Sequence, residues 1–393
     1  MSGAIPMDSF ARKLSLAAVL SGAFGVGVTF GFFTPLVSLF MERLGYGSAL
    51  IGLNAAAGAL AILVTGPYAT VLASRLGTVR TIVAGTSVAA AAVLMFPLFS
   101  TVWALFPLRL LGGAGAALNW IVTETWISTL PPERWRGRVI ATYAVVWGLG
   151  LAIGPVLLNF VGTRGATPFL FCAVLLALSC VPAMLVNRYA PAIGRKDQRV
   201  RVGYALGMAP VGIFAALLAG VAEQSFLGLL PIWGLGIALS TDQAVLLTTL
   251  FAVGGVVFML PLGWLSDKTG RFGLLIAVVC ASTLCTAILP LLSGHVLPVF
   301  VTTVALGGAV AGFYTLGLTL IGETSAARGA DIASLNTVFI MAYTSGAVFG
   351  PVVAGTGMDL WPPDGLMVVL AALFASFVPA AFWLRRLPAT PAA

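Results

Sequence analysis

Residues 245–293 read VLLTTLFAVGGVVFMLPLGWLSDKTGRFGLLIAVVCASTLCTAILPLLS. Two long apolar runs flank a short loop that holds Asp267, Lys268 and Arg271. An α-helix needs about 20 apolar residues to cross a hydrocarbon layer that is about 30 Å thick. The stretch therefore predicts two membrane-spanning helices joined by a tight, charged loop.

The same pattern extends along the whole chain, which is 60% hydrophobic and 8% charged, whereas a soluble domain is about 25% charged. A backbone that crosses lipid must satisfy its own hydrogen bonds, and the ten-residue alternating segments of a β-barrel are absent. The prediction is an all-α membrane protein with twelve transmembrane helices. The predicted spans are 12–40, 48–73, 78–100, 102–130, 138–161, 165–188, 205–237, 243–266, 271–293, 296–323, 331–356 and 364–386.

The basic residues predict the orientation in the membrane. Of the 20 Lys and Arg residues, Arg43 and Arg164 fall in odd-numbered gaps and Arg109 lies within a span. The others lie at the N-terminus, in even-numbered gaps or after the last span, so both termini are predicted to be cytoplasmic. Because these charges are scattered over short loops, the net charge of +8 predicts topology and no nucleic-acid partner. The four cysteines lie inside spans without metal-like spacing, so no metal and no cofactor are expected.

An internal repeat divides the chain into two halves. The most charged gap, 187–202, separates six spans from six, which predicts bundles at 1–188 and 205–393 joined by a cytoplasmic linker, 189–204. Parallel repeats of this kind enclose a substrate site at their interface. The paired landmarks are Gly77 with Gly270, Gly112-Gly113 with Gly307-Gly308, Arg136-Gly137 with Arg328-Gly329, and Gly150-x-x-x-Gly154-Pro155 with Gly346-x-x-x-Gly350-Pro351, at offsets from 192 to 196.

The loop that begins at Gly263 contains Asp267, Lys268, Gly270 and Arg271 in the order G-x-x-x-D-[RK]-x-G-[RK]. It resembles the signature loop of the major facilitator superfamily of secondary transporters. The chain is similar to poorly characterised bacterial permeases of that family over nearly all of its length.

The equivalent loop after the second span keeps Arg75 and Gly77, but Ser74 replaces the acidic residue and Thr78 the final basic one. Gly150, Gly154 and Pro155 resemble a fifth-span pattern that the family associates with antiporters, which implies efflux. Gly346, Gly350 and Pro351 repeat the pattern in the second half. Small residues four apart let helices approach closely, so these positions are expected to serve as packing seams, as hinges, or as both.

Charges inside spans are costly and mark function. Arg109 in the fourth span and Glu223 in the seventh are the best cases. In the family, the first, fourth, seventh and tenth spans line the central cavity, so the resemblance implies that both side chains reach it. Glu223 is the candidate protonatable coupling residue, with Arg109 as its partner or as an anion site. The alternative is that Arg109 snorkels outward and Glu223 is a satisfied core carboxylate.

Polar and aromatic residues on the cavity spans and on neighbouring helices are the further candidates for substrate contact. Each of the aromatics has a competing interpretation as a core or lipid-facing side chain. The candidates are Phe24, Phe33, Asn119, Trp120, Thr123, Tyr143, Trp147, Gln224, Phe226, Tyr314, Thr315, Asn336 and Tyr343.

Two groups of charges at the cytoplasmic ends are expected to form gates, because the family pairs acidic residues there with basic residues of the signature loops. The alternative is ordinary solvated loop charges. The second-half group is Asp267, Arg271, Glu323 and Arg328, and the looser first-half group is Arg75, Glu124, Arg136 and Arg138.

The sequence thus predicts a monomeric secondary transporter in a bacterial inner membrane that moves a small organic solute by alternating access, coupled to protons. Export is preferred, and uptake of a sugar or organic acid remains open. A sensor or assembly partner with a transporter fold is the alternative from another class. The chain has no phosphate-binding Gly-x-x-x-x-Gly-Lys-[Ser/Thr] motif and one histidine, so neither ATP-driven pumping nor an enzymatic activity is expected.

Overall fold

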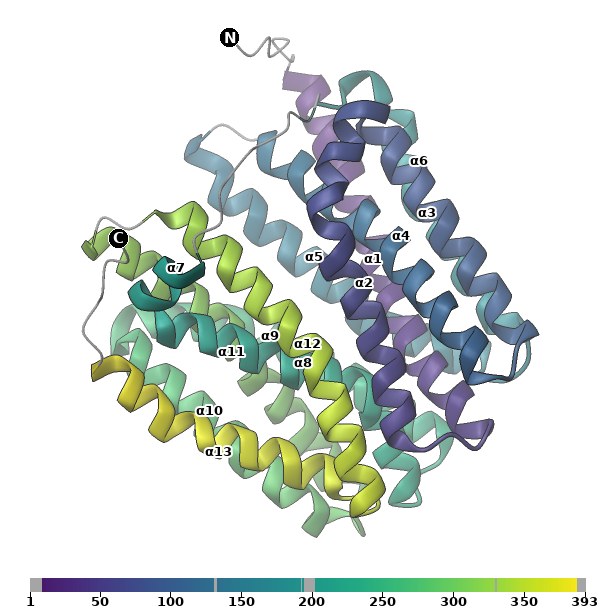
Figure 1. The fold of residues 1–393 in the computed structure, drawn as a ribbon, viewed down its shortest axis with the longest axis vertical. Coiled ribbons are helices and arrows are strands. Elements are labelled where there is room, and N and C mark those ends of the chain that lie inside the picture. Colours follow the sequence, from purple (N-terminus) through teal and green to yellow (C-terminus); the bar gives the residue numbers. More distant parts are fainter. Residues whose placement is uncertain (1–8, 131–132, 192, 194–201, 329–330, 387–393) are drawn as a thin grey trace. The chain divides into compact units, whose positions relative to one another are not determined.

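The computed structural model describes residues 9–130, 133–191, 193, 202–328 and 331–386 (Figure 1). This described part contains helices and their connections but no strand. Twelve of the helices are long and apolar enough to cross a membrane. The predicted all-α fold with twelve spans is therefore confirmed. Most of the predicted linker, 189–204, lies outside the described residues.

The helices follow one another with short connections. Three 3₁₀ turns, at Phe96–Leu98, Asn187–Tyr189 and Leu289–Leu292, extend α3, α6 and α10. The helices are α1 (Ser9–Arg43), α2 (Ser48–Leu76), α3 (Thr78–Met95), α4 (Val102–Thr129), α5 (Glu133–Val161), α6 (Thr167–Leu185), α7 (Val202–Met208), α8 (Pro210–Gly236), α9 (Thr241–Thr269), α10 (Arg271–Ile288), α11 (Val296–Arg328), α12 (Ile332–Leu360) and α13 (Gly365–Arg386).

The predicted seventh span, 205–237, is wrong at its start. The short helix α7 ends at Met208, and the spanning helix α8 begins at Pro210. Between them Ala209 has φ −136° and ψ 53°, which is not helical. Proline lacks the backbone N–H and pushes the preceding residue out of the helical region. The break therefore follows from Pro210, which the hydropathy pattern does not register.

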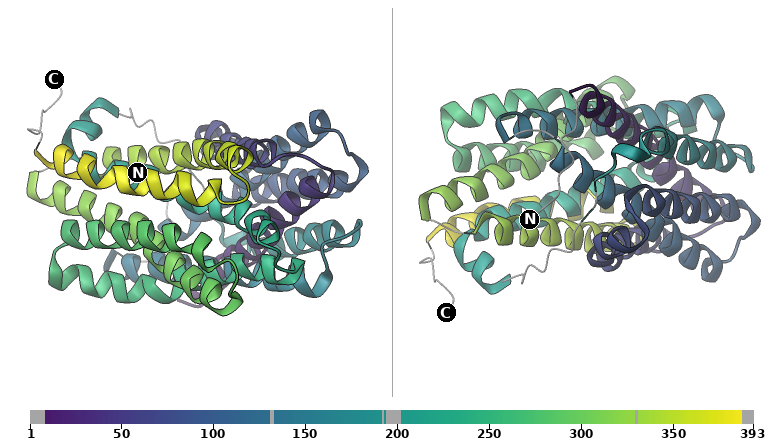
Figure 2. Two further views of the ribbon diagram at one scale, coloured as in Figure 1. Left: turned by 90° about the horizontal axis from the view of Figure 1, so that it is seen from below. Right: turned by 90° about the horizontal axis from the view of Figure 1, so that it is seen from above.

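By their contacts the helices form two compact units. Unit 1 comprises 1–36 and 60–196, and unit 2 comprises 37–59 and 197–393. Within each unit the helices run side by side along most of their length (Figures 1 and 2). The contacts thus assign the connected ends of α1 and α2 to unit 2, whereas the sequence repeat assigns both helices to the first half. The bundle boundaries at 188 and 205 stay a prediction.

In unit 1, α1 and α5 touch backbone to backbone through glycines. A Cβ atom added to Gly27 would collide with the carbonyl of Trp147, and one added to Gly150 would lie 2.5 Å from the carbonyl oxygen of Phe24. Gly154 is in similar contact with Val28. Close approach of this kind is the main packing device of membrane helices, because lipid removes the hydrophobic drive for association. This face of α5 therefore tolerates no side chain at its glycines.

Unit 2 repeats this seam between α8 and α12. Gly220 meets the carbonyl of Tyr343, Gly346 meets that of Leu217, and Gly350 meets Val221. Each contact is a unit 1 contact shifted by 193 positions on the first helix and by 196 on the second. The internal repeat is therefore a repeat of three-dimensional contacts, and it aligns the two units residue by residue.

The paired loop glycines are also equivalent. Gly77 has φ 93° and precedes α3, and Gly270 has φ 88° and precedes α10. Residues with a Cβ rarely adopt this conformation. Gly150, Gly154, Gly346 and Gly350, which are predicted packing positions, each lie against the backbone of a neighbouring helix. Pro155 and Pro351 lie inside α5 and α12, and their role as hinges stays a prediction.

We predict that Gly346→Ala destabilises the protein, because the new methyl group has no room against the α8 backbone. Overpacking costs about 1–3 kcal/mol, and the measurement is the midpoint of thermal unfolding in detergent. The matched control is Gly322→Ala on α11, where an added Cβ meets nothing within 4 Å. Equal midpoints for the two variants would contradict the importance of the seam.

Candidate functional site

Unit 2 places a carboxylate beside a tyrosine at the α8–α12 seam. Gly220 brings α8 against the backbone of Tyr343, so Glu223, one turn later, faces the Tyr343 side chain. The Tyr343 hydroxyl donates a hydrogen bond to Glu223 Oε2 at 2.8 Å. Both side chains are half-buried. The close helix contact thus creates a hydrogen-bonded acid within a membrane span.

Tyrosine and phenylalanine rings extend this acidic site toward α11. Tyr314 on α11 meets the Tyr343 ring edge-on, with centroids 5.4 Å apart, and the ring of Phe339 lies 5.0 Å from that of Tyr314. The ring packing fixes the orientation of Tyr343, which in turn holds Glu223. Two predicted site residues, Tyr314 and Tyr343, are therefore brought together with Glu223.

The equivalent position in unit 1 holds an aromatic pair. The offsets of the two seams align Glu223 with Phe30 and Tyr343 with Trp147. The rings of Phe30 and Trp147 are in contact, with centroids 6.2 Å apart. The same backbone geometry therefore carries an acid in unit 2 and only aromatic surface in unit 1.

Trp147 continues into a second group on α4. Trp120 stacks nearly parallel to Trp147, with centroids 6.5 Å apart and planes at 16°. Tyr143, one turn before Trp147, interacts with both Trp120 and Glu124. Glu124 itself is exposed. Four side chains from α4 and α5 thus form one aromatic and acidic face.

Arg109 lies in a different part of unit 1. Its side chain is 6% exposed, and its guanidinium carbon lies 5.0 Å from the centre of the Phe33 ring. Among the described residues its buried Nε atom has no hydrogen-bond partner. Phe33 in turn packs edge-on against Phe96 at 5.4 Å. The predicted pairing of Arg109 with Glu223 joins two separate units and stays a prediction.

Asn119 and Thr123 take part in the contact between α3 and α4. Asn119 donates from Nδ2 to Thr86 Oγ1 at 2.8 Å, and Thr123 donates to Asn119 Oδ1 at 3.2 Å. All three side chains are buried. Their hydrogen bonds join the helices, which favours a structural role over substrate contact.

The remaining candidates are divided between core and surface. Phe226 is fully buried against Phe251, and Gln224 is buried, whereas Phe24 is 37% exposed. The Thr315 hydroxyl donates to the carbonyl of Ala311 in its own helix. In the described part of the chain, the buried Oδ1 of Asn336 has no hydrogen-bond partner.

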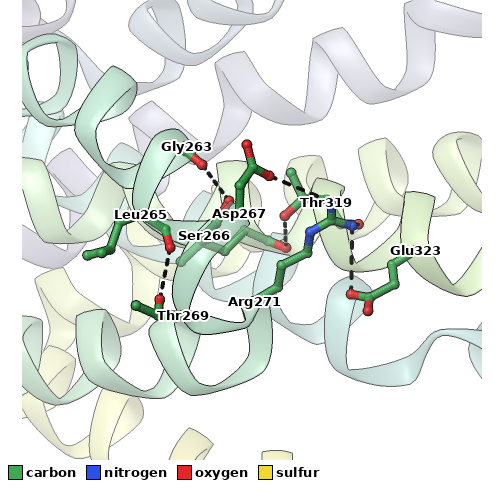
Figure 3. A network of polar contacts seen from close by, with 9 residues as sticks. Gly263, Leu265, Ser266, Asp267, Thr269, Arg271, Thr319 and Glu323 are labelled. Carbon is green, nitrogen blue, oxygen red and sulfur yellow. Dashed lines mark hydrogen bonds and ion pairs between the residues drawn. The ribbon is translucent and has the colours of Figure 1, made fainter.

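The signature loop forms a charge network at one end of unit 2 (Figure 3). The Arg271 guanidinium lies between two carboxylates, 3.9 Å from Asp267 and 3.7 Å from Glu323. Its Nη1 also donates to the carbonyl of Thr319 at 3.0 Å. Arg271 starts α10, Asp267 lies in the last turn of α9 and Glu323 belongs to α11, so the network joins three helices. A cavity of about 480 Å³ lies beside it.

Three of the four residues predicted for this network are therefore together, and the side chain of the fourth, Arg328, is outside the described part. Lys268 contacts the Trp264 ring at 3.7 Å instead. The Gly263 carbonyl accepts a hydrogen bond from Ser266 at 2.6 Å.

The described side chains of the first-half charges form no matching network. Arg138 stacks on its neighbour Trp135 at 4.9 Å, and Arg75 is exposed. Among the side chains that the structure describes, neither forms an ion pair with Glu124. The side chain of Arg136 is not among them. At the position equivalent to Arg271, Thr78 donates to the carbonyl of Pro191.

Phe30, Phe339, Thr319 and Asp359 were missed by the sequence reasoning. The repeat itself held the signal for Phe30, because the seam offset of 193 aligns it with Glu223. At the offset of 195 for α4 and α11, Glu323 aligns with Ser128 and Glu124 with Thr319. Glu124 and Glu323 are therefore not equivalent residues.

Comparison with known proteins assigns the family. Residues 19–294 and 212–393 match the profile of the Major Facilitator Superfamily. The chain belongs to this family. A multi-pass membrane location and a small-molecule substrate follow from membership of this transporter superfamily and from the twelve spans.

Relatives of this major facilitator chain have full-length similarity. YfkF of Bacillus subtilis, an "uncharacterized MFS-type transporter", is 27% identical over 89% of this chain and 90% of its own length. The similarly described YcaD of Salmonella typhimurium is 21% identical over 98% of each chain.

Solved structures show the same fold. The nucleoside transporter NupG has a TM-score of 0.76 at 14% identity and covers 95% of this chain and 99% of its own. A bacterial homologue of the human lysosomal transporter Spinster, in an inward-facing and unoccupied conformation, has a TM-score of 0.74 at 14% identity over 98% of both chains.

In this member of the superfamily, Asp359 fastens the start of α2 to the end of α12 within unit 2. Its carboxylate accepts hydrogen bonds from the backbone N–H groups of Ser48 at 2.7 Å and Ala49 at 3.0 Å. A carboxylate at a helix N-terminus accepts hydrogen bonds from N–H groups that have no partner within the helix, and its negative charge interacts favourably with the helix dipole. Gly355 and Gly52 let the two helices approach closely at the same place.

We predict that Asp359→Ala lowers the thermal unfolding midpoint, because the first N–H groups of α2 lose their acceptor. Loss of such a cap costs about 0.5–2 kcal/mol. Asp359→Asn should lose less, since the amide retains one acceptor oxygen. An unchanged midpoint for the alanine variant would show that the contact contributes nothing.

Proposed function

We propose that this protein is a proton-coupled secondary transporter that moves a small organic solute across a bacterial inner membrane by alternating access. The two units carry the same seam and different side chains, which suits a transporter in which one half binds protons. Export is the preferred direction, on the basis of the Gly-Pro pattern at Gly150–Pro155, with uptake as the other outcome of the test.

The hydrogen bond between Glu223 and Tyr343 carries the proposal. A carboxylate within a membrane span is expensive and calls for a function. The phenol donates to the charged carboxylate and stabilises it, whereas a proton on Glu223 removes that charge. Because the pair bridges α8 and α12, protonation changes the contact between two helices. Proton binding is thereby linked to helix packing.

The Arg271 network is proposed as a gate on the cytoplasmic side. The distribution of Lys and Arg along the chain supports a cytoplasmic side for the α9–α10 loop and for both termini. Ion pairs among Asp267, Arg271 and Glu323 hold α9, α10 and α11 together there. Such a network biases the conformation without touching the solute.

Glu223→Gln is predicted to abolish solute accumulation driven by a pH gradient, because glutamine cannot exchange a proton. The assay uses proteoliposomes with an imposed pH gradient and radiolabelled sugars, amino acids, organic acids and lipophilic cations. Tyr343→Phe should remain active with its pH profile moved to higher pH, since the charged carboxylate loses a donor. If the wild type still accumulates solute after the pH gradient is collapsed, the proposal of proton coupling is contradicted. A protein that moves none of these solutes would favour the sensor alternative.

A second prediction concerns the gate. Glu323→Gln should raise the labelling rate of an Ala326→Cys reporter by a membrane-impermeant maleimide, up to about fivefold, because an ion pair of this exposure contributes about 0.2–1 kcal/mol. Ala326 is exposed and lines a second cavity, which is also bordered by Asp267, Arg271 and Glu323. Arg386→Gln is the control that changes charge at the end of α13. Equal rates for Glu323→Gln and its parent would argue against a gate.

A further inference from the structure

The composition of the aromatic and acidic face of unit 1 favours ligands of one sign of charge. Trp120 and Glu124 are one turn apart on α4, and Tyr143 and Trp147 are one turn apart on α5, so each pair lies on one side of its helix. Phe30 on α1 completes the group through its contact with Trp147. We call these five residues the aromatic face.

The aromatic face is accessible. Phe30, Trp120 and Trp147 are half-buried, Glu124 is exposed, and only Tyr143 is buried. An exposed carboxylate inside a membrane span faces water or a protein cavity, because contact with lipid is too costly. The rings beside Glu124 therefore belong to a wetted surface and are open to a ligand.

The electrostatics of the aromatic face favour a cation. Aromatic ring faces carry negative potential and attract cations, most strongly for tryptophan. The carboxylate of Glu124 adds a charge of the same sign. None of the basic side chains in the described ranges pairs with it. Arg109 is 15 positions earlier on α4 and thus about 22 Å away along the helix axis. Among the described side chains, an anion or a zwitterion therefore finds no matching positive group at this face.

The repeat shows that the aromatic face is particular to unit 1. In unit 2, Thr315 occupies the position of Trp120, and Thr319 occupies that of Glu124. The Thr319 carbonyl is already bound by Arg271. The symmetric framework alone therefore does not require tryptophan and glutamate at the unit 1 positions.

We infer that the aromatic face of unit 1 is a half-site for a lipophilic organic cation, in which Glu124 neutralises the charge and Trp120 and Trp147 contact the apolar body. Because the solute of the transport cycle would bind here, the inference rests on the proposed function and names its substrate class. Proton binding at Glu223 and solute binding at the aromatic face then belong to different units.

Equilibrium binding to the purified full-length protein in detergent tests the inference. Tetraphenylphosphonium and tetraphenylborate have the same shape and opposite charge, and they are titrated separately. The wild type should bind the cation at least about tenfold more tightly than the anion. Trp147→Ala and Trp120→Ala should each weaken cation binding about threefold to thirtyfold, and Glu124→Gln should remove most of the preference over the anion.

Two variants serve as controls. Trp103→Leu removes a tryptophan that is on the same helix, is 86% exposed and has no part in the aromatic face, so cation binding should not change. Glu124→Asp keeps the charge and should retain the preference for the cation. Each variant must elute as a single species with an unfolding midpoint near that of the wild type.

Equal affinity of the wild type for both ions, no binding of the cation, or normal binding by Glu124→Gln would each overturn the inference. The binding assay uses no gradient, so its outcome is independent of proton coupling. Cation binding without gradient-driven accumulation would leave the half-site standing and remove the transport proposal. Gradient-driven accumulation of another solute without cation binding would do the reverse.

Discussion

Contact between glycine-lined helix backbones is the constraint on which the rest of this structure depends. In lipid there is no hydrophobic driving force for apolar helices to associate. Their association therefore depends on close van der Waals packing, which glycines allow by letting the backbones touch. At Gly150 and Gly346 the space for a side chain is filled by a carbonyl of the partner helix. Once these seams are fixed, the side chains one turn away on each helix are also placed.

The same seam carries two different chemistries. In unit 2 it brings Glu223 to within hydrogen-bond distance of Tyr343, and in unit 1 it brings Phe30 to Trp147. The repeated backbone thus brings equivalent positions together in both units, whereas the side chains at those positions differ. An acid in one unit and an aromatic surface in the other suit a transporter that binds its proton and its solute at separate places.

Much of the fold was predictable, because a membrane-spanning helix is identified by the hydropathy of one continuous segment of sequence. The loop at Gly263–Arg271 gave the family, and the repeat gave the equivalence of Gly77 with Gly270. The break before Pro210 was missed because hydropathy averages over a window and a single proline does not alter it. The candidate site was only partly predictable. Asn119 and Thr123 have the composition of a binding site, but their hydrogen bonds join α3 to α4.

The sequence by itself determined the twelve spans, their helical form and the position of the charged loops, since each depends on properties of neighbouring residues. Only the tertiary structure decided which polar side chains meet. Glu223 and Tyr343 are 120 positions apart, yet the structure joins them by a hydrogen bond. Such encounters depend on how closely two helices pack and on their rotation about their own axes. Neither quantity can be read from one helix alone.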